Sequence, residues 1–233
     1  MRINLLLCLS LAACQSEARL GVSRAWPEMG TMMSVAVWAS DTDRAGRALT
    51  AAHDAVERVD SLLQRHAAVA AIDSLRRAMR QRTGVAIVTD SIAPGYALDR
   101  AALALGAVDS ALLDVGGQYV WIGRATHRAV GIPDPDNTLR TIATVDLRGG
   151  SIRTAGRRNA PRAAVRSVTV LAPGALAASA WAFVFLSWGC DRAIAEPQGF
   201  GVVCADSAGV RVTTDLRNRV SLPPPPATPA PAP

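Results

Sequence analysis

Two adjacent glycines, Gly116 and Gly117, follow a short apolar run that ends in Asp114 and Val115. Glycine lets the backbone approach a bound group closely, and a glycine turn can present amide groups to a phosphate. The same pair is typical of a tight β-turn between two strands, which is the preferred interpretation. A third glycine at the spacing of a dinucleotide fingerprint is missing, so a Rossmann site is not predicted.

The other residues with reactive side chains form no recognisable catalytic or metal-binding motif. The histidines His53, His66 and His127 lack metal-ligand spacing, and no Gly-x-Ser-x-Gly motif exposes a nucleophilic serine. Cys190 and Cys204 are the cysteines in the body of the chain. They either form a disulfide in an oxidising compartment or remain two buried thiols, and the residues alone leave both open.

The composition bears on the size of the core and on the class of partner. The chain has 233 residues, half of them hydrophobic, which suits a single domain with a substantial core. The net charge is +6, and all of the positive side-chain charge comes from arginine, since lysine is absent. Aromatic residues make up 4% of the chain. Because the arginines are spread along the chain and form no stripe with aromatic residues, we do not expect nucleic-acid binding.

The elements that must position these residues follow from the spacing of apolar side chains. Helical spacing predicts helices at 45–63, 67–82, 98–105 and 173–189. Short apolar runs predict strands at 34–39, 110–115, 118–122, 142–147, 151–156, 167–171, 200–204 and 210–213. Asp41 to Asp43 can cap the first helix. The Gly149-Gly150 turn and the turn at 206–209 predict a hairpin each.

The segment Ile92-Ala93-Pro94-Gly95-Tyr96-Ala97-Leu98-Asp99-Arg100 predicts a small-residue turn that leads into a helix, and Asp114-Val115-Gly116-Gly117-Gln118 follows later. Together they resemble the central signature of the ApbE family, the FAD:protein FMN transferases. Its usual form is D-L-G-G-I-A-K-G-Y-A-V-D, followed by a helix and a strand ending in G-G-D/N. The sequences HRAVGIPDP at 127–135 and SVTV at 167–170 also resemble family motifs. The resemblance spans roughly Met29 to Thr214.

The resemblance implies an α+β fold of the ApbE-like, T-fold-related type. In this fold antiparallel-rich sheets pack with helices in a single domain, which we place at residues 26–221. From Pro223 onward the chain contains only Pro, Ala and Thr. Residues 222–233 are therefore predicted to form a disordered or polyproline II tail.

The N-terminus predicts export and a lipid anchor. Arg2 supplies a positive charge, and residues 5–11 form an apolar run too short to span a bilayer. Leu11-Ala12-Ala13-Cys14 fits the bacterial lipobox, in which lipid is attached to the cysteine. We expect a signal peptide at 1–13 and a tether at 14–25, anchored through Cys14 in the inner or outer membrane of the bacterial cell envelope and facing the periplasm. A plain secretory signal, with Cys14 incidental, is the alternative.

The resemblance implies FAD and Mg²⁺ as ligands. FAD would lie against the residues at the family's flavin positions, Met32, Met33, Ser91, Pro94, Gly116, Gly117, Gly131 and Ile132. The family's metal ligands are a backbone carbonyl of the central signature and an Asp and a Thr on the late helix. Those positions fall on Ser91, Ser179 and Phe183. A serine in place of a carboxylate loses a Coulomb attraction of several kcal/mol, so we expect weak magnesium binding.

Other departures from the family concern its active site. Pro94 stands where the family has a lysine, and a long insert that precedes the central signature is absent. The segment 157–166 is too short for the family's Tyr and His-x-x-x-Pro-x-Thr-Gly motif, and the expected histidine is missing. The sequence therefore assigns no catalytic residue.

Two functional hypotheses follow from the resemblance. The first is an FAD:protein FMN transferase that moves FMN from FAD to a threonine of an exported flavoprotein. The second is a catalytically degenerate lipoprotein of the same family, which binds flavin or a protein partner without transfer. The retained scaffold motifs favour the first, and the substituted metal positions favour the second.

Overall fold

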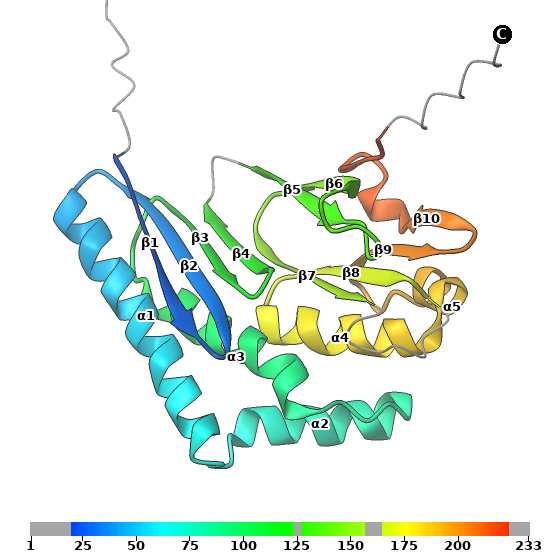
Figure 1. Cartoon of the computed structure of the whole chain (residues 1–233), viewed down its shortest axis with the longest axis horizontal. Coiled ribbons are helices and arrows are strands. Elements are labelled where there is room, and N and C mark those ends of the chain that lie inside the picture. Colours follow the sequence, from blue (N-terminus) through cyan, green and yellow to red (C-terminus); the bar gives the residue numbers. More distant parts are fainter. Residues whose placement is uncertain (1–19, 124–126, 157–164, 224–233) are drawn as a thin grey trace, which may run out of the picture.

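In the computed structural model, which describes residues 20–123, 127–156 and 165–223, two antiparallel sheets and a set of helices pack together (Figure 1). The larger sheet contains, in spatial order, β1 (Leu20–Glu28), β2 (Thr31–Ala39), β3 (Ser110–Val115), β4 (Gln118–Gly123), β7 (Gly150–Gly156), β8 (Ser167–Ala172), β9 (Gly201–Asp206) and β10 (Gly209–Val212). The smaller sheet contains β11 (Val220–Ser221), β6 (Thr141–Leu147) and β5 (Arg128–Pro133). This mixed architecture confirms the predicted α+β fold.

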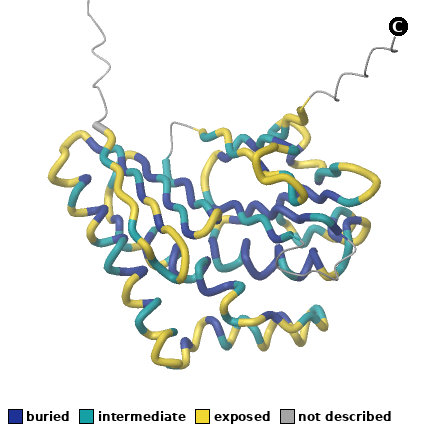
Figure 2. Tube along the Cα trace, viewed as in Figure 1, coloured by how far each residue is buried: buried dark blue, intermediate teal, exposed yellow. Residues whose placement is uncertain are grey.

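The helices cover one face of the larger sheet, and the smaller sheet covers the other. The helices are α1 (Thr42–Gln64), α2 (Ala70–Thr83), α3 (Thr89–Ala104), α4 (Ala175–Trp188) and α5 (Cys190–Ala195), with a 3-10 turn at Thr214–Leu216. α1 and α3 pack over β2 and β3, whereas α4 packs over β7 and β8. Figure 2 shows the deepest burial in the central strands and α4, with exposed residues along α1 and α2.

α1 forms as its periodicity predicts. Asp41 is the N-cap, and its side chain accepts a hydrogen bond from the Asp43 amide at 2.9 Å. The apolar residues spaced at three and four positions lie on the sheet side, where Ala52 and Val56 are fully buried.

The segment from Ile92 to Tyr96 is helical, so the turn predicted there is wrong. α3 begins at Thr89 and includes Pro94 and Gly95. A Cβ on Gly95 would lie 2.5 Å from the Ala175 carbonyl oxygen of α4. The glycine is therefore required by close contact between two helices, and this tertiary contact overrides the local preference of Pro and Gly for a turn.

The hairpin predicted across Gly149-Gly150 is also wrong. β6 pairs with β5 and β11 in the smaller sheet, whereas β7 pairs with β4 and β8 in the larger one. A Cβ on Gly150, whose φ is +79°, would lie 2.5 Å from the Ala172 carbonyl oxygen. The glycines therefore carry the chain from one sheet to the other. The last predicted hairpin is confirmed, because β9 pairs with β10.

The predicted tether at 14–25 overlaps the folded domain. β1 begins at Leu20 and pairs with β2 along its whole length, from Leu20 opposite Ala39 to Glu28 opposite Thr31. Residues 20–25 therefore belong to the sheet. Cys14 and the predicted signal peptide lie outside the described residues, as do residues 224–233 of the predicted tail.

Within the part of the chain that the structure describes, no helix combines the length and the apolar character needed to cross a bilayer.

Cys190 and Cys204 form a disulfide, which decides the question that the sequence left open. Their sulfur atoms are 2.02 Å apart and their Cα atoms 5.5 Å apart. Cys190 starts α5 and Cys204 lies in β9, and both are almost fully buried. The bond ties the short last helix to the sheet.

Reduction of this disulfide is expected to lower the free energy of unfolding. The bond closes a loop between residues 14 positions apart, and such loops contribute about 3 kcal/mol, chiefly by restricting the unfolded chain. Urea denaturation of the oxidised and the reduced protein measures the difference. The Cys190→Ala/Cys204→Ala variant is the control and should not respond to reductant, and a wild-type protein equally indifferent to reductant would contradict the prediction.

Candidate functional site

A cavity of about 260 Å³ lies between the two sheets, where the turn between β3 and β4 faces β5 and β7. Small-molecule sites commonly enclose about 300–1,000 Å³, so this cavity can enclose part of a dinucleotide. Its walls combine apolar side chains with a few polar groups, and include Gly116, Gly117, Tyr119, Gly131, Asp134 and Thr154.

The Gly116-Gly117 pair forms the two-residue turn of the β3–β4 hairpin. The φ angles are +58° and +79°, a backbone that a type I′ turn requires and that glycine adopts readily. The Gly116 amide donates to the Met32 carbonyl at 3.2 Å, and the Gly117 amide donates to Asp114 Oδ1 at 2.8 Å. Since both amides have partners, the turn is structural and does not present a free amide pair to a phosphate.

Tyr119 is the main polar side chain that sequence reasoning missed in the cavity. Burial raises the pKa of its hydroxyl, and the nearby charge of Asp114 raises it further. The hydroxyl therefore stays protonated at neutral pH and can donate a hydrogen bond to a bound group. The only signal in the sequence was its place in a strand after the glycine turn, which does not reveal the face it occupies.

Asp134 contributes little free negative charge to the cavity. Arg166 donates to Asp134 Oδ1 at 2.9 Å and, through Nε, to Asp136 Oδ2 at 2.8 Å. The Asp134 carboxylate also accepts the Asp136 amide at 2.9 Å. At this rim of the cavity Asp134 is therefore paired with a cation and held in an ordered turn.

The residues at the family's flavin positions divide between the two faces of the larger sheet. Gly116, Gly117 and Gly131 line the cavity. Met32 is 54% exposed, and the side chain of the preceding residue, Thr31, lies against the glycine turn. Ile132 is only 1% exposed and belongs to the apolar core between the two sheets.

Met33, Ser91 and Pro94 lie on the helix side of the sheet, away from the cavity. Met33 is fully buried against α1 and α3. Ser91 and Pro94 are in α3, which packs on α4. The structure therefore places these three residues on the helix side of the sheet and not in the cavity.

Ser179, at the family's aspartate position, is fully buried in a neutral hydrogen-bond cluster. Its hydroxyl donates to Gln118 Oε1 at 2.7 Å. Gln118 Nε2 donates to the Ala175 carbonyl at 2.7 Å and to Ser151 Oγ at 3.4 Å. We call these four residues the Gln118 cluster.

The residues at these positions do not fit a magnesium ion. The Gln118 cluster contains no carboxylate, and its side-chain groups already satisfy one another. Phe183, at the family's threonine position, packs into the apolar core. The chemistry of this site must therefore be explained without a metal held by Ser179 and Phe183.

Asp99 of the central signature has a structural role. Gly174, the N-cap of α4, has no side chain to cap the helix. Asp99 instead accepts the Ala175 amide at 2.6 Å and the Leu176 amide at 3.0 Å. A negative charge at a helix N-terminus is stabilising, so Asp99 locks α3 to α4.

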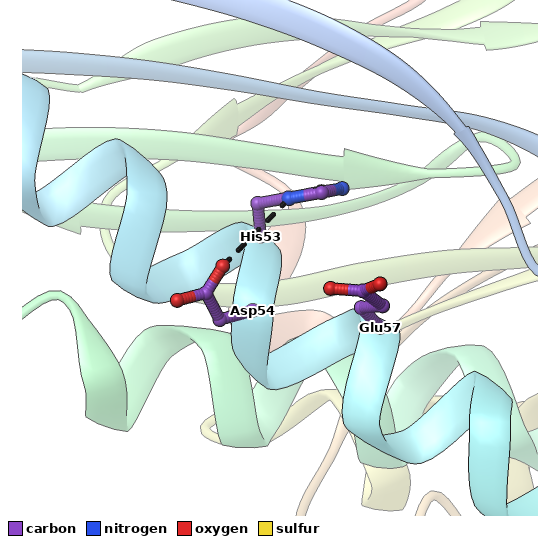
Figure 3. Close-up of side chains that lie close together, drawn as sticks. All are labelled: His53, Asp54 and Glu57. Carbon is purple, nitrogen blue, oxygen red and sulfur yellow. Dashed lines mark ion pairs between the residues drawn. The ribbon is translucent and has the colours of Figure 1, made fainter.

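One group on α1 has the residue types of a metal site. His53, Asp54 and Glu57 each offer a ligand atom, all within 4.8 Å of one another (Figure 3). Glu57 lies four positions after His53 and three after Asp54, and residues at these spacings are neighbours on a helix surface. The His53 ring stacks on Trp26 and its Nε2 lies 2.9 Å from Glu28 Oε1. These contacts show that His53 attaches α1 to β1. The group does not line the cavity.

Magnesium should bind the wild-type protein only weakly, and isothermal titration measures this directly. The Ser179→Asp/Phe183→Thr variant restores the family's ligand types but buries a carboxylate in a neutral cluster. We expect it to unfold at lower denaturant in EDTA, by about 3 kcal/mol, and to recover part of that loss in Mg²⁺. The Phe183→Thr variant is the control and should show no magnesium response. Tight stoichiometric binding by wild type would contradict this account.

The comparisons with known proteins agree with this architecture. The chain is similar to a flavin transferase ApbE from Vibrio cholerae, with a TM-score of 0.68 and 15% identity over 87% of this chain and 100% of that one. It is also similar to the apo flavinyl transferase ApbE of Pseudomonas stutzeri, with a TM-score of 0.64 and 15% identity over 87% of this chain and 98% of that one. At such identities the likeness shows the fold. No curated protein sequence matches the chain. The ApbE family profile matches residues 30–161, more than half of the 233 residues, and the chain therefore belongs to the ApbE family.

Proposed function

We propose that this protein is a flavin transferase that moves FMN from FAD to a threonine of an exported flavoprotein. The observation that supports this most is the cavity itself, because family motifs far apart in the sequence supply its walls. Gly116 and Gly117 come from the central signature, Gly131 and Asp134 from the G-I-x-D-P motif, and Thr154 from β7. The Vibrio cholerae and Pseudomonas stutzeri ApbE proteins with this fold are a flavin and a flavinyl transferase.

The proposed reaction is a substitution at phosphorus. The threonine Oγ forms a bond to the FMN phosphorus of FAD, and the bond from that phosphorus to the bridging oxygen of the AMP half breaks. The hydroxyl proton passes to solvent, and AMP leaves with the bridging oxygen. In this chain Val130 and Ile152 give the cavity apolar surface for a ring, and Tyr119 supplies a hydrogen-bond donor.

A second function is supported by the Gln118 cluster. Because the metal positions hold a closed neutral network, a protein that binds flavin without transferring it is the alternative. Binding without covalent labelling of an acceptor would favour this alternative.

FAD binding by the full chain tests the cavity. We expect FAD to bind in EDTA, measured by the change in flavin fluorescence, and Tyr119→Ala to weaken binding at least about tenfold, since a wall and a donor are lost. Leu139→Ala is the control, because Leu139 is 96% exposed in the turn before β6. Incubation with a threonine-containing acceptor then separates transfer, seen as covalent fluorescence in a denaturing gel, from binding alone. Equal FAD affinity in Tyr119→Ala and wild type would remove the cavity from the proposal.

We also propose that the protein works in the cell envelope, anchored through Cys14. The lipobox residues support the anchor, and the Cys190–Cys204 disulfide suits an oxidising compartment. Cys14→Ser should move the protein from the membrane fraction to the soluble envelope fraction, whereas Cys8→Ser should not. Retention of the Cys14→Ser protein in the membrane fraction would argue against the anchor.

A further inference from the structure

Arg153 of β7 lies on the helix face of the larger sheet. Its neighbours Ile152 and Thr154 line the cavity on the opposite face, and successive side chains of a strand alternate between faces. β7 packs directly on α4 (Figure 1). β4 and β7 pair with Tyr119 opposite Ile152, so one further step along these strands places Gln118 beside Arg153. Arg153 is therefore next to the Gln118 cluster.

Arg153 lacks a hydrogen-bond or ion-pair partner among the described residues. Its Nε is buried without a hydrogen bond. Asp114 acts on it electrostatically, yet no ion pair joins the two. Burial lowers the pKa of Arg153, but a guanidinium keeps its charge in proteins. By contrast, Arg166 pairs with two carboxylates.

The buried Nε without a partner costs stability, whereas the terminal nitrogens of the guanidinium are not buried in this way. A buried donor without a partner costs free energy, and a charged one costs more. The residue nevertheless keeps partial contact with solvent. A partner from outside the chain can therefore reach the guanidinium, and a guanidinium binds anions.

The ladder between β4 and β7 ends at the pair Tyr119–Ile152, so β7 has no strand partner on its β4 side from Arg153 onward. We propose that the phosphate groups of a flavin dinucleotide held in the cavity pass this edge of β7 and bind Arg153, which supplies the positive charge that a divalent metal cannot supply here. This inference rests on the proposed function. It accounts for two departures from the family pattern together, because Ser179 lacks a carboxylate and Pro94 replaces a lysine, and Arg153 offers a cation beside Gln118. A guanidinium can donate two parallel hydrogen bonds to phosphate oxygens, and a preorganised cation stabilises the charge that develops during phosphoryl transfer.

Titration of the full chain with inorganic pyrophosphate in EDTA tests this role. Wild type should bind pyrophosphate without a metal, and added salt should weaken the binding. Arg153→Met should bind at least about tenfold more weakly, and Arg153→Lys should fall between them, since lysine keeps the charge but not the fork. Arg47→Met, an exposed change of the same charge on α1, is the control and should match wild type.

The melting temperature provides a second measurement. If Arg153 stabilised the fold, the Arg153→Met variant would melt at a lower temperature than wild type. Arg153→Met removes an unpaired buried donor, so this variant should unfold at the same or a higher temperature than wild type. Loss of pyrophosphate affinity together with equal or greater stability supports a binding role. Unchanged pyrophosphate affinity, or no binding by wild type in EDTA, overturns it.

Riboflavin and FAD separate this inference from the proposed function. If FAD binds wild type and Arg153→Met equally, the role of Arg153 fails while flavin binding stands. If neither flavin binds wild type but pyrophosphate binding still depends on Arg153, the anion site stands and the proposed function fails. Riboflavin carries no phosphate, so its affinity should be the same in the two proteins.

Discussion

The close approach of α3 to α4 is the constraint on which the rest of the structure depends. Gly95 permits it, because a Cβ there would clash with the Ala175 carbonyl and with Ser179 Oγ. Asp99 then secures it by accepting two amides at the start of α4. The Ala175 carbonyl and Ser179, held in this way, complete the hydrogen bonds of Gln118. In this structure, Gly95 and Asp99 of the central signature serve to pack α3 against α4.

The residues that join α3 to α4 match the family signature, whereas Ser179 differs from the residue that the family has at its position. The glycine and the aspartate that make the helix contact are retained, because either substitution would break packing or leave buried amides without partners. At the position where the resemblance places an aspartate, Ser179 has its hydrogen bond satisfied by Gln118. The fold therefore does not need a carboxylate at this position.

Local patterns predicted the elements well and their partners poorly. The periodicity and the Asp41 cap of α1 are properties of one segment, and they appear in the sequence directly. The sheet to which β6 or β7 belongs depends on distant strands, so two adjacent strands separated by glycines looked like a hairpin. Gly95 looked like a turn residue for the same reason. Nothing in the sequence indicated that Arg153 is unusual. Its Nε becomes buried without a partner only when α4 packs on the sheet.

The junction of β4 with β7 divides the larger sheet into two halves of nearly sequential strands. Only three residue pairs make this junction, Tyr119–Ile152, Val120–Ser151 and Trp121–Gly150, whereas β2 and β3 share six. The cavity lies on one face of this short junction, and the Gln118 cluster lies on the other. The same few residues of β4 and β7 therefore position both, since Tyr119 and Ile152 line the cavity while Gln118 and Ser151 belong to the cluster.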